Sequence, residues 1–170
     1  MAEEKNVNDT PGTENTDTKE TDIKTDANKS IRNHVIVSMG AGLIPLPGVD
    51  LVAITGVQLN MLRKLSKIYE IPFSEHKVKN IVSSLIGGGT SIPVAGAFAS
   101  VVKFIPVVGQ AIGAVSLPIS AGAITYAVGK VFLQHFASGG TFLTFDPDKV
   151  RDYYNEMLKE GKTVAAGMKS

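Results

Sequence analysis

The chain has 170 residues with 17 basic and 16 acidic side chains, and it contains no cysteine and no tryptophan. The absence of cysteine excludes disulfide bonds, thiol catalysis and thiolate metal sites. The charges are unevenly spread, since residues 1–30 hold eight acidic residues against four lysines, whereas residues 31–145 hold eight basic residues against three acidic ones. The N-terminus lacks the apolar stretch of a signal peptide, so we expect any membrane insertion to use internal segments.

Residues 1–30 are rich in Thr, Asp, Asn, Glu and Lys, and we expect them to form a disordered acidic tail. Val7 and Ile23 are the sizeable aliphatic residues of this segment. Such a segment cannot bury enough apolar area to offset the entropy cost of ordering it. A solubilising tail is the simpler interpretation, and a tether or docking arm is the functional alternative.

A first apolar hairpin is expected over residues 31–70. Asp50 is the only formal charge between Val35 and Leu62. Two prolines and a glycine within residues 44–48 would interrupt a straight helix. The pattern therefore predicts one helix over about 31–43 and a second over about 48–70.

A second apolar hairpin is expected over residues 75–138. Pro72 ends the preceding helix, and Ser74 is placed to cap the next one. Residues 80–102 carry no charge, and residues 104–129 form a further run of 26 uncharged residues, with Lys103 and Lys130 on either side. Pro118 should kink the last of these helices.

The motif Ile-Pro-x-x-Gly occurs three times, at residues 44–48, 92–96 and 105–109. Similar residues precede the first two copies, which is typical of duplicated helical hairpins with Gly/Pro interruptions in corresponding places. Chance remains the alternative, because the motif is short and its residues are common.

Length and composition favour a membrane environment over a soluble core for residues 31–140. A helix of 26 residues is about 39 Å long, enough to cross a hydrocarbon layer of about 30 Å. Small residues recur at a spacing of four, and in lipid they allow close helix packing: Gly96 with Ser100, and Gly109 with Gly113. The predicted fold class is all-α, with two repeat-related, membrane-embedded hairpins, and we also expect a homo-oligomer. A soluble helical bundle is the alternative.

Basic residues concentrate between the two hairpins, and they are Arg63, Lys64, Lys67, Lys77 and Lys79. Positive charge favours the cytoplasmic side of an inner membrane. We therefore expect this loop and both termini to be cytoplasmic, whether the hairpins span the bilayer or re-enter it.

Residues 141–170 are expected to form a cytoplasmic amphipathic helix with a frayed end. Asp146 and Pro147 resemble an N-cap followed by the first helical residue, and Gly161 is placed to end the helix. An apolar stripe at helical spacing, which we expect to dock a partner, comprises Val150, Tyr153, Tyr154, Met157 and Leu158.

Asp50 is the residue most suggestive of chemistry, because intramembrane acids usually pair or line a pathway. An intramembrane ion pair with Lys103 or Lys130 is one interpretation. The simpler interpretation, which we favour, places Asp50 in the first turn of its helix, where the helix dipole stabilises a negative charge.

No constellation of catalytic or cofactor-binding residues is evident. The three histidines are far apart and lack carboxylates at metal-ligand spacing. The glycines at 87–89 are not followed by the Lys-Ser/Thr of a phosphate-binding loop. The basic residues lie beside apolar stretches and aromatic residues are few, so we expect no nucleic-acid binding. We expect a protein that is not an enzyme, with no cofactor and no metal.

The stretch Ala41-Gly-Leu-Ile-Pro-Leu-Pro-Gly-Val-Asp50, together with residues 59–71 and the Ile-Pro-Val-Val-Gly segment within 104–130, resembles a bacterial family of unknown function. This family is similar to the membrane domain of YcjF-type inner-membrane proteins, which are fused to or encoded beside small GTPases. The resemblance covers about residues 31–160 and implies a GTPase-linked membrane module. Since this chain has no nucleotide-binding motif, the GTPase would be a separate polypeptide.

Three functions follow from these expectations. The first is a small integral membrane scaffold that works with a soluble partner such as a small GTPase. The second is an oligomeric pore or channel, including a membrane-inserting effector. The third is a soluble helical bundle that binds lipid.

Overall fold

The computed structural model describes residues 14–43, 49–87 and 110–168. These residues form five α-helices and the segments that join or flank them. The helices are α1 (Glu14–Ala41), α2 (Val49–Ile68), α3 (Glu75–Gly87), α5 (Gln110–Ala137) and α6 (Arg151–Met168). The three Ile-Pro-x-x-Gly motifs, and hence the predicted hairpin repeat, lie outside the described residues.

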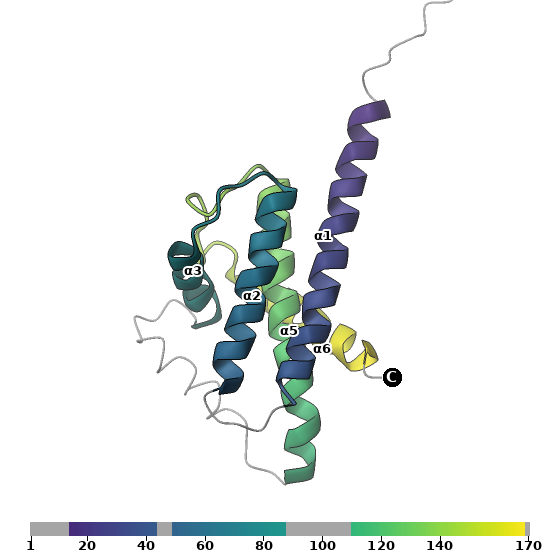
Figure 1. The fold of residues 1–170 in the computed structure, drawn as a ribbon, viewed down its shortest axis with the longest axis vertical. Coiled ribbons are helices and arrows are strands. Elements are labelled where there is room, and N and C mark those ends of the chain that lie inside the picture. Colours follow the sequence, from purple (N-terminus) through teal and green to yellow (C-terminus); the bar gives the residue numbers. More distant parts are fainter. Residues whose placement is uncertain (1–13, 44–48, 88–109, 169–170) are drawn as a thin grey trace, which may run out of the picture.

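Three helices, α1, α2 and α5, contact one another pairwise, while α6 packs on α5 and α3 packs on α2 (Figure 1). Helix α1 runs antiparallel to α2 and α5 (Figure 1). A shared layer fixes the register, since a methyl group built on Gly129 of α5 would lie 2.8 Å from Ile31 Cγ1 of α1 and 3.1 Å from Met61 Sδ of α2. The absence of a side chain at Gly129 therefore allows the three helices to meet closely.

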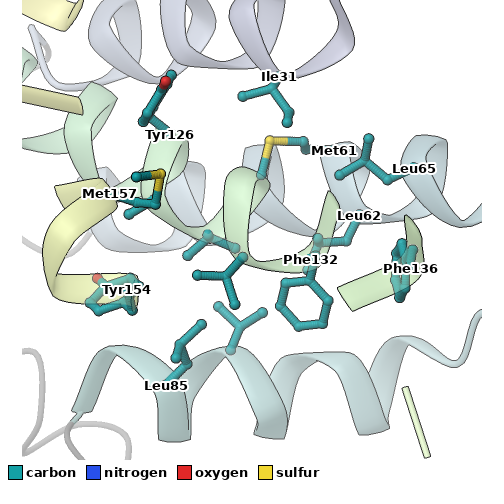
Figure 2. Close-up of a cluster of buried hydrophobic side chains, with 14 of the residues drawn as sticks. Ile31, Met61, Leu62, Leu65, Leu85, Tyr126, Phe132, Phe136, Tyr154 and Met157 are labelled. Atoms are coloured by element: carbon teal, nitrogen blue, oxygen red, sulfur yellow. The ribbon is translucent and has the colours of Figure 1, made fainter. Parts of the chain in front are cut away.

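The core is one continuous cluster of buried hydrophobic side chains. Figure 2 shows side chains from all five helices in this cluster, including Ile31, Met61, Leu85, Phe132 and Tyr154. Local spacing explains the buried faces, because residues three or four apart lie on one side of a helix. Buried residues of α2 follow this rule, with Met61, Leu62 and Leu65 on the same side of the helix as the buried amide of Gln58.

The prediction of membrane-embedded hairpins is wrong. Within residues 14–43, 49–87 and 110–168, no helix combines the length and the apolar character needed to cross a bilayer. The apolar helix α5 has α1, α2 and α6 packed around it. A helix that is apolar on all sides is typical of a membrane span or of the centre of a helical bundle. The described part of α5 lies at the centre of the bundle, where Ala123, Ala127 and Val128 are fully buried within this chain.

The prediction of disorder for residues 1–30 is wrong from Glu14 onwards, because α1 begins there. Hydrophilic side chains support the helix locally, since Lys24 pairs with Glu20 one turn earlier and the Thr25 hydroxyl donates to the Thr21 carbonyl. The buried core begins at Ala27, from which the rest of α1 packs against its neighbours. Packing of the part of α1 after Ala27 therefore stabilises a helix that continues back into a segment whose composition alone disfavours helix formation.

The predicted break between the hairpins is confirmed as a connection between helices. Helix α2 ends at Ile68, and Glu70 adopts a positive φ of 55°. The Ile71 amide then donates to the Ser66 carbonyl at 2.7 Å, which closes the helix end. Ser74 precedes α3, as its predicted capping role requires.

The C-terminal helix differs from its predicted bounds. The Asp146 carboxylate accepts a hydrogen bond from the Asp148 amide, so Asp146 caps a turn that precedes the helix. Helix α6 starts at Arg151 and continues through Gly161 to Met168. Gly161 is buried inside the helix, because α6 approaches the backbone of α5 at this point.

Candidate functional site

Four large hydrophobic side chains are exposed near one end of the bundle, where α1 ends and the described side chains of α5 begin. They are Ile36 (51% exposed), Val37 (55%), Leu43 (67%) and Leu117 (40%). Ile36 lies in the last turns of α1, and Leu43 lies in the turn that follows the helix end at Ala41. The backbone of Pro118 lies beside Gly42, which places Leu117 near Leu43. We call these four residues the apolar end.

Moving away from the apolar end, α1, α2 and α5 reach charged residues at a common level, next to the layer formed by Ile31, Met61 and Gly129. The charged residues at this level are Arg32 of α1, Arg63 of α2 and Lys130 of α5. Asp50 lies below that level, and α6 crosses α5 there with Lys159, Glu160 and Lys162 exposed.

A groove of about 400 Å³ lies between α1, α5 and α6 at that same level. Its polar wall carries Arg32, Asn28 and Lys130, and its apolar wall carries Ile31, Val164 and Met168. Lys130 Nζ donates a hydrogen bond of 2.9 Å to Asn28 Oδ1. We call this feature the basic groove.

Tyr126 forms part of the basic groove and fixes its charged groups on both sides. Its ring lies 5.5 Å from Lys130 Nζ, a cation–π distance. Its hydroxyl donates to Glu160 Oε1 at 2.6 Å. Burial, together with the hydrogen bond to Glu160, raises the pKa of Tyr126 well above its ordinary value. The hydroxyl therefore stays a neutral donor that holds Glu160 of α6 against α5.

A smaller cavity of about 150 Å³ lies between α1 and α2 and is lined in part by His34, Asn60 and Lys64. His34 is 5% exposed, and its Nδ1 donates to the Ser30 carbonyl at 2.7 Å. Asn60 Nδ2 lies 3.4 Å from His34 Nε2. Burial lowers the pKa of His34, and the charge of Lys64 lowers it further, although the bond to Ser30 acts in the opposite direction. The geometry fits a neutral imidazole that accepts from Asn60.

The predicted ion pair of Asp50 with Lys103 or Lys130 stays a prediction. Asp50 is the second residue of α2, as the alternative helix-dipole interpretation requires, but its side chain and all of Lys103 lie outside the described residues. Lys130 is described, and it contacts Asn28 of α1 and the ring of Tyr126.

Most of the predicted helix-packing residues cannot be placed. Gly96, Ser100 and Gly109 lie outside the described residues, and Gly113 is known only as a position within α5. The close approaches to another helix that the structure describes involve other glycines, and these include Gly42, Gly122, Gly129 and Gly161. Gly122 and Gly129 are separated by one heptad, a spacing that could have revealed them.

The predicted partner-docking stripe faces the interior of this chain. Tyr154 and Met157 are buried, and Val150, Tyr153 and Leu158 pack against the same core. The stripe is therefore covered by α5 and its neighbours within this chain, and docking of a separate partner on it stays a prediction. An amphipathic pattern identifies a buried face, but it does not distinguish an intramolecular neighbour from a separate partner.

Groups of three or more residues able to hold a metal ion do not occur among the described residues.

Comparison with known proteins gives a family and one relative of note. Magnetosome membrane protein 22 of Magnetospirillum gryphiswaldense is 38% identical over 148 residues, which cover 85% of this chain and 74% of that protein. No solved structure matches the chain. The link to YcjF-type, GTPase-associated proteins is not among these findings. A family model described as a domain of unknown function, DUF697, matches residues 12–163, and the chain therefore belongs to the DUF697 family.

Proposed function

We propose that this chain is a membrane-associated helical scaffold without catalytic activity of its own, whose apolar end contacts a lipid bilayer. The observation that carries the proposal is the exposure of Ile36, Val37, Leu43 and Leu117 at an end where α1 and α5 have no charged side chains among their described residues. The similarity to a magnetosome membrane protein supports a membrane location. The contact proposed here is interfacial, made by exposed side chains of a folded bundle.

The expected strength of this contact follows from the exposed side chains. Complete burial of a Val, Leu or Ile side chain contributes about 1.5–3 kcal/mol. Ile36 and Leu43 are already partly covered, so each would contribute about 1 kcal/mol on reaching the acyl boundary. Removing both should weaken binding roughly thirtyfold.

Vesicle flotation tests the contact. The full-length wild-type chain should float with phospholipid vesicles, and the variant Ile36→Ser/Leu43→Ser should remain largely unbound. Leu143→Ser is a matched control, because Leu143 is 78% exposed and follows the opposite end of α5. Absence of flotation by the wild type, or equal losses for both variants, would contradict the proposal.

The partner of the scaffold is proposed to be a separate small GTPase, on the basis of the resemblance of residues 41–50 and their flanking segments to YcjF-type proteins. We further propose that the partner is met on the cytoplasmic face of a bacterial inner membrane. Capture by the immobilised full-length chain should retain such a GTPase more strongly with one guanine nucleotide than with the other. Equal retention with GDP and with a GTP analogue, or none with either, would count against this partner.

A further inference from the structure

The basic groove carries an inference that rests on the proposed membrane contact and deepens it. We propose that the groove between α1, α5 and α6 binds the phosphate of an anionic phospholipid headgroup. The groove volume of about 400 Å³ is within the range of small-molecule sites and would accept a headgroup with part of its glycerol unit.

The charges of the groove suit a phosphate. Arg32 and Lys130 approach the groove from different helices, and neither has an ion-pair partner among the described carboxylates. Guanidinium groups bind phosphate oxygens in a bidentate manner, and ammonium groups add a compact positive charge. The bond to Asn28 and the Tyr126 ring already hold Lys130 at the groove, so less conformational entropy is lost when a ligand binds.

An opposing charge adjoins the groove at Glu160, whose carboxylate accepts a hydrogen bond from the hydroxyl of the groove residue Tyr126. Its carboxylate would repel a phosphate if it turned toward the groove. Glu160 therefore provides a charge of opposite sign at the same site, and its removal should strengthen anion binding where removal of a cation weakens it.

The position of the groove favours a lipid over a free anion. Ile31, Val164 and Met168 form an apolar wall beside the cations, which a free phosphate ion would not use. Arg32 and Ile36 are one helical turn apart on the exposed face of α1. A lipid held by its phosphate at Arg32 would therefore have its acyl chains directed past Ile36 toward the apolar end.

Flotation with two kinds of vesicle tests this inference. The full-length chain should bind vesicles of phosphatidylcholine and phosphatidylglycerol more strongly than vesicles of phosphatidylcholine alone. Arg32→Gln and Lys130→Gln should each reduce binding to the anionic vesicles by about fivefold. Lys67→Gln is the matched control, since Lys67 is exposed in the last turn of α2 and does not line the groove, and should change binding by less than about twofold. Glu160→Gln should increase binding, and circular dichroism should show that each variant remains folded.

The outcomes separate this inference from the function on which it rests. If the wild type floats with neither kind of vesicle, the proposed membrane contact itself fails. If it floats and the Ile36→Ser/Leu43→Ser variant does not, but Arg32→Gln and Lys130→Gln match Lys67→Gln, only the headgroup site is refuted. Added glycerol phosphate distinguishes the ligand source, because full release from the vesicles at low concentration would show that a free phosphate suffices and would overturn the lipid assignment.

Discussion

The side chains of α5 are described over residues 117–137, and the two halves of this segment pack by opposite means, although both lie within the same apolar helix. The earlier half uses small residues, and the absence of a side chain at Gly122 lets α1 and α6 come close to its backbone. Its later half uses large rings, and Phe132 stacks on Phe145 with 4.4 Å between ring centroids. Close approach in the first half makes the helix intolerant of added atoms, whereas volume filling in the second half makes it intolerant of lost atoms.

The first prediction concerns the aromatic half and carries the largest expected effect. Phe132 is fully buried and also contacts the rings of Phe136 and Phe142. Phe132→Ala should lower the free energy of unfolding by about 3–5 kcal/mol, because it opens a cavity that the rigid neighbours cannot fill. Chemical denaturation followed by circular dichroism measures the change.

Leu143→Ala serves as the control for that measurement, since Leu143 is exposed and should change stability by less than about 0.5 kcal/mol. If Phe132→Ala does not fold, Phe132→Leu should give a smaller loss. A loss below about 1 kcal/mol for Phe132→Ala would mean that this half of α5 tolerates missing volume.

The second prediction tests the small-residue half by adding one methyl group. A methyl group on Gly161 would lie 2.8 Å from the Ala123 carbonyl oxygen, whereas one on Gly167, in the same helix, would meet nothing within 4 Å. Gly161→Ala should therefore destabilise the chain by about 1–3 kcal/mol. Gly167→Ala should be neutral or stabilise by up to about 1 kcal/mol, because alanine favours the helix. Thermal unfolding of the two variants measures the difference. Equal changes in unfolding temperature would show that α6 has room for a methyl group beside α5.

The third prediction concerns a polar contact inside the small-residue half. The hydroxyls of Ser38 and Thr125 share a hydrogen bond of 2.8 Å, and both residues are fully buried. Ser38→Ala should cost about 1–3 kcal/mol, because it leaves the Thr125 hydroxyl without this partner. The double variant Ser38→Ala/Thr125→Val should lose less than the sum of the single changes. A double-mutant cycle with additive losses would indicate that the bond does not couple α1 to α5.

The fourth prediction is the smallest effect and concerns pH. Because the pKa of His34 in the folded chain is below its ordinary value of 6.5, the unfolded chain takes up this proton at a higher pH than the folded chain does. His34 should therefore reduce stability progressively as the pH falls below about 6.5, until the folded pKa is passed. Comparing the unfolding free energies of the wild type and His34→Gln from neutral pH to about pH 5 isolates this contribution. Parallel curves would show that the imidazole is not buried as a neutral group.

Local signals predicted the helix boundaries better than they predicted the surroundings of the helices. Pro72 and Ser74 mark the connection between α2 and α3, because proline and N-cap residues act through their own backbone. The location of α5 at the centre of a bundle depends on α1 and α2, which are distant in sequence, as well as on the following helix α6. Its uncharged composition fits lipid and bundle equally, so composition alone favoured the wrong environment.

The candidate site was less predictable than the fold for the same reason. Lys130 was identified as a bracketing charge, but its partner Asn28 lies 102 residues earlier in the chain. Arg32 was not predicted as a site residue, because nothing near it in sequence indicates that α5 and α6 complete a groove beside it. Such juxtapositions arise from helix packing, which single-residue patterns do not encode.

Helix α1 projects past the bundle at its N-terminal end (Figure 1), and this gives a single helix two local stabilities. From Thr18 to Asp26 its side chains are mostly exposed, whereas Ile31 and Val35 are buried in the core. Backbone amides in the projecting turns should therefore exchange with deuterium by brief fraying, and those around Ile31 only when the whole domain opens. The projecting turns can then melt or be cleaved by a protease while the folded bundle beneath them persists.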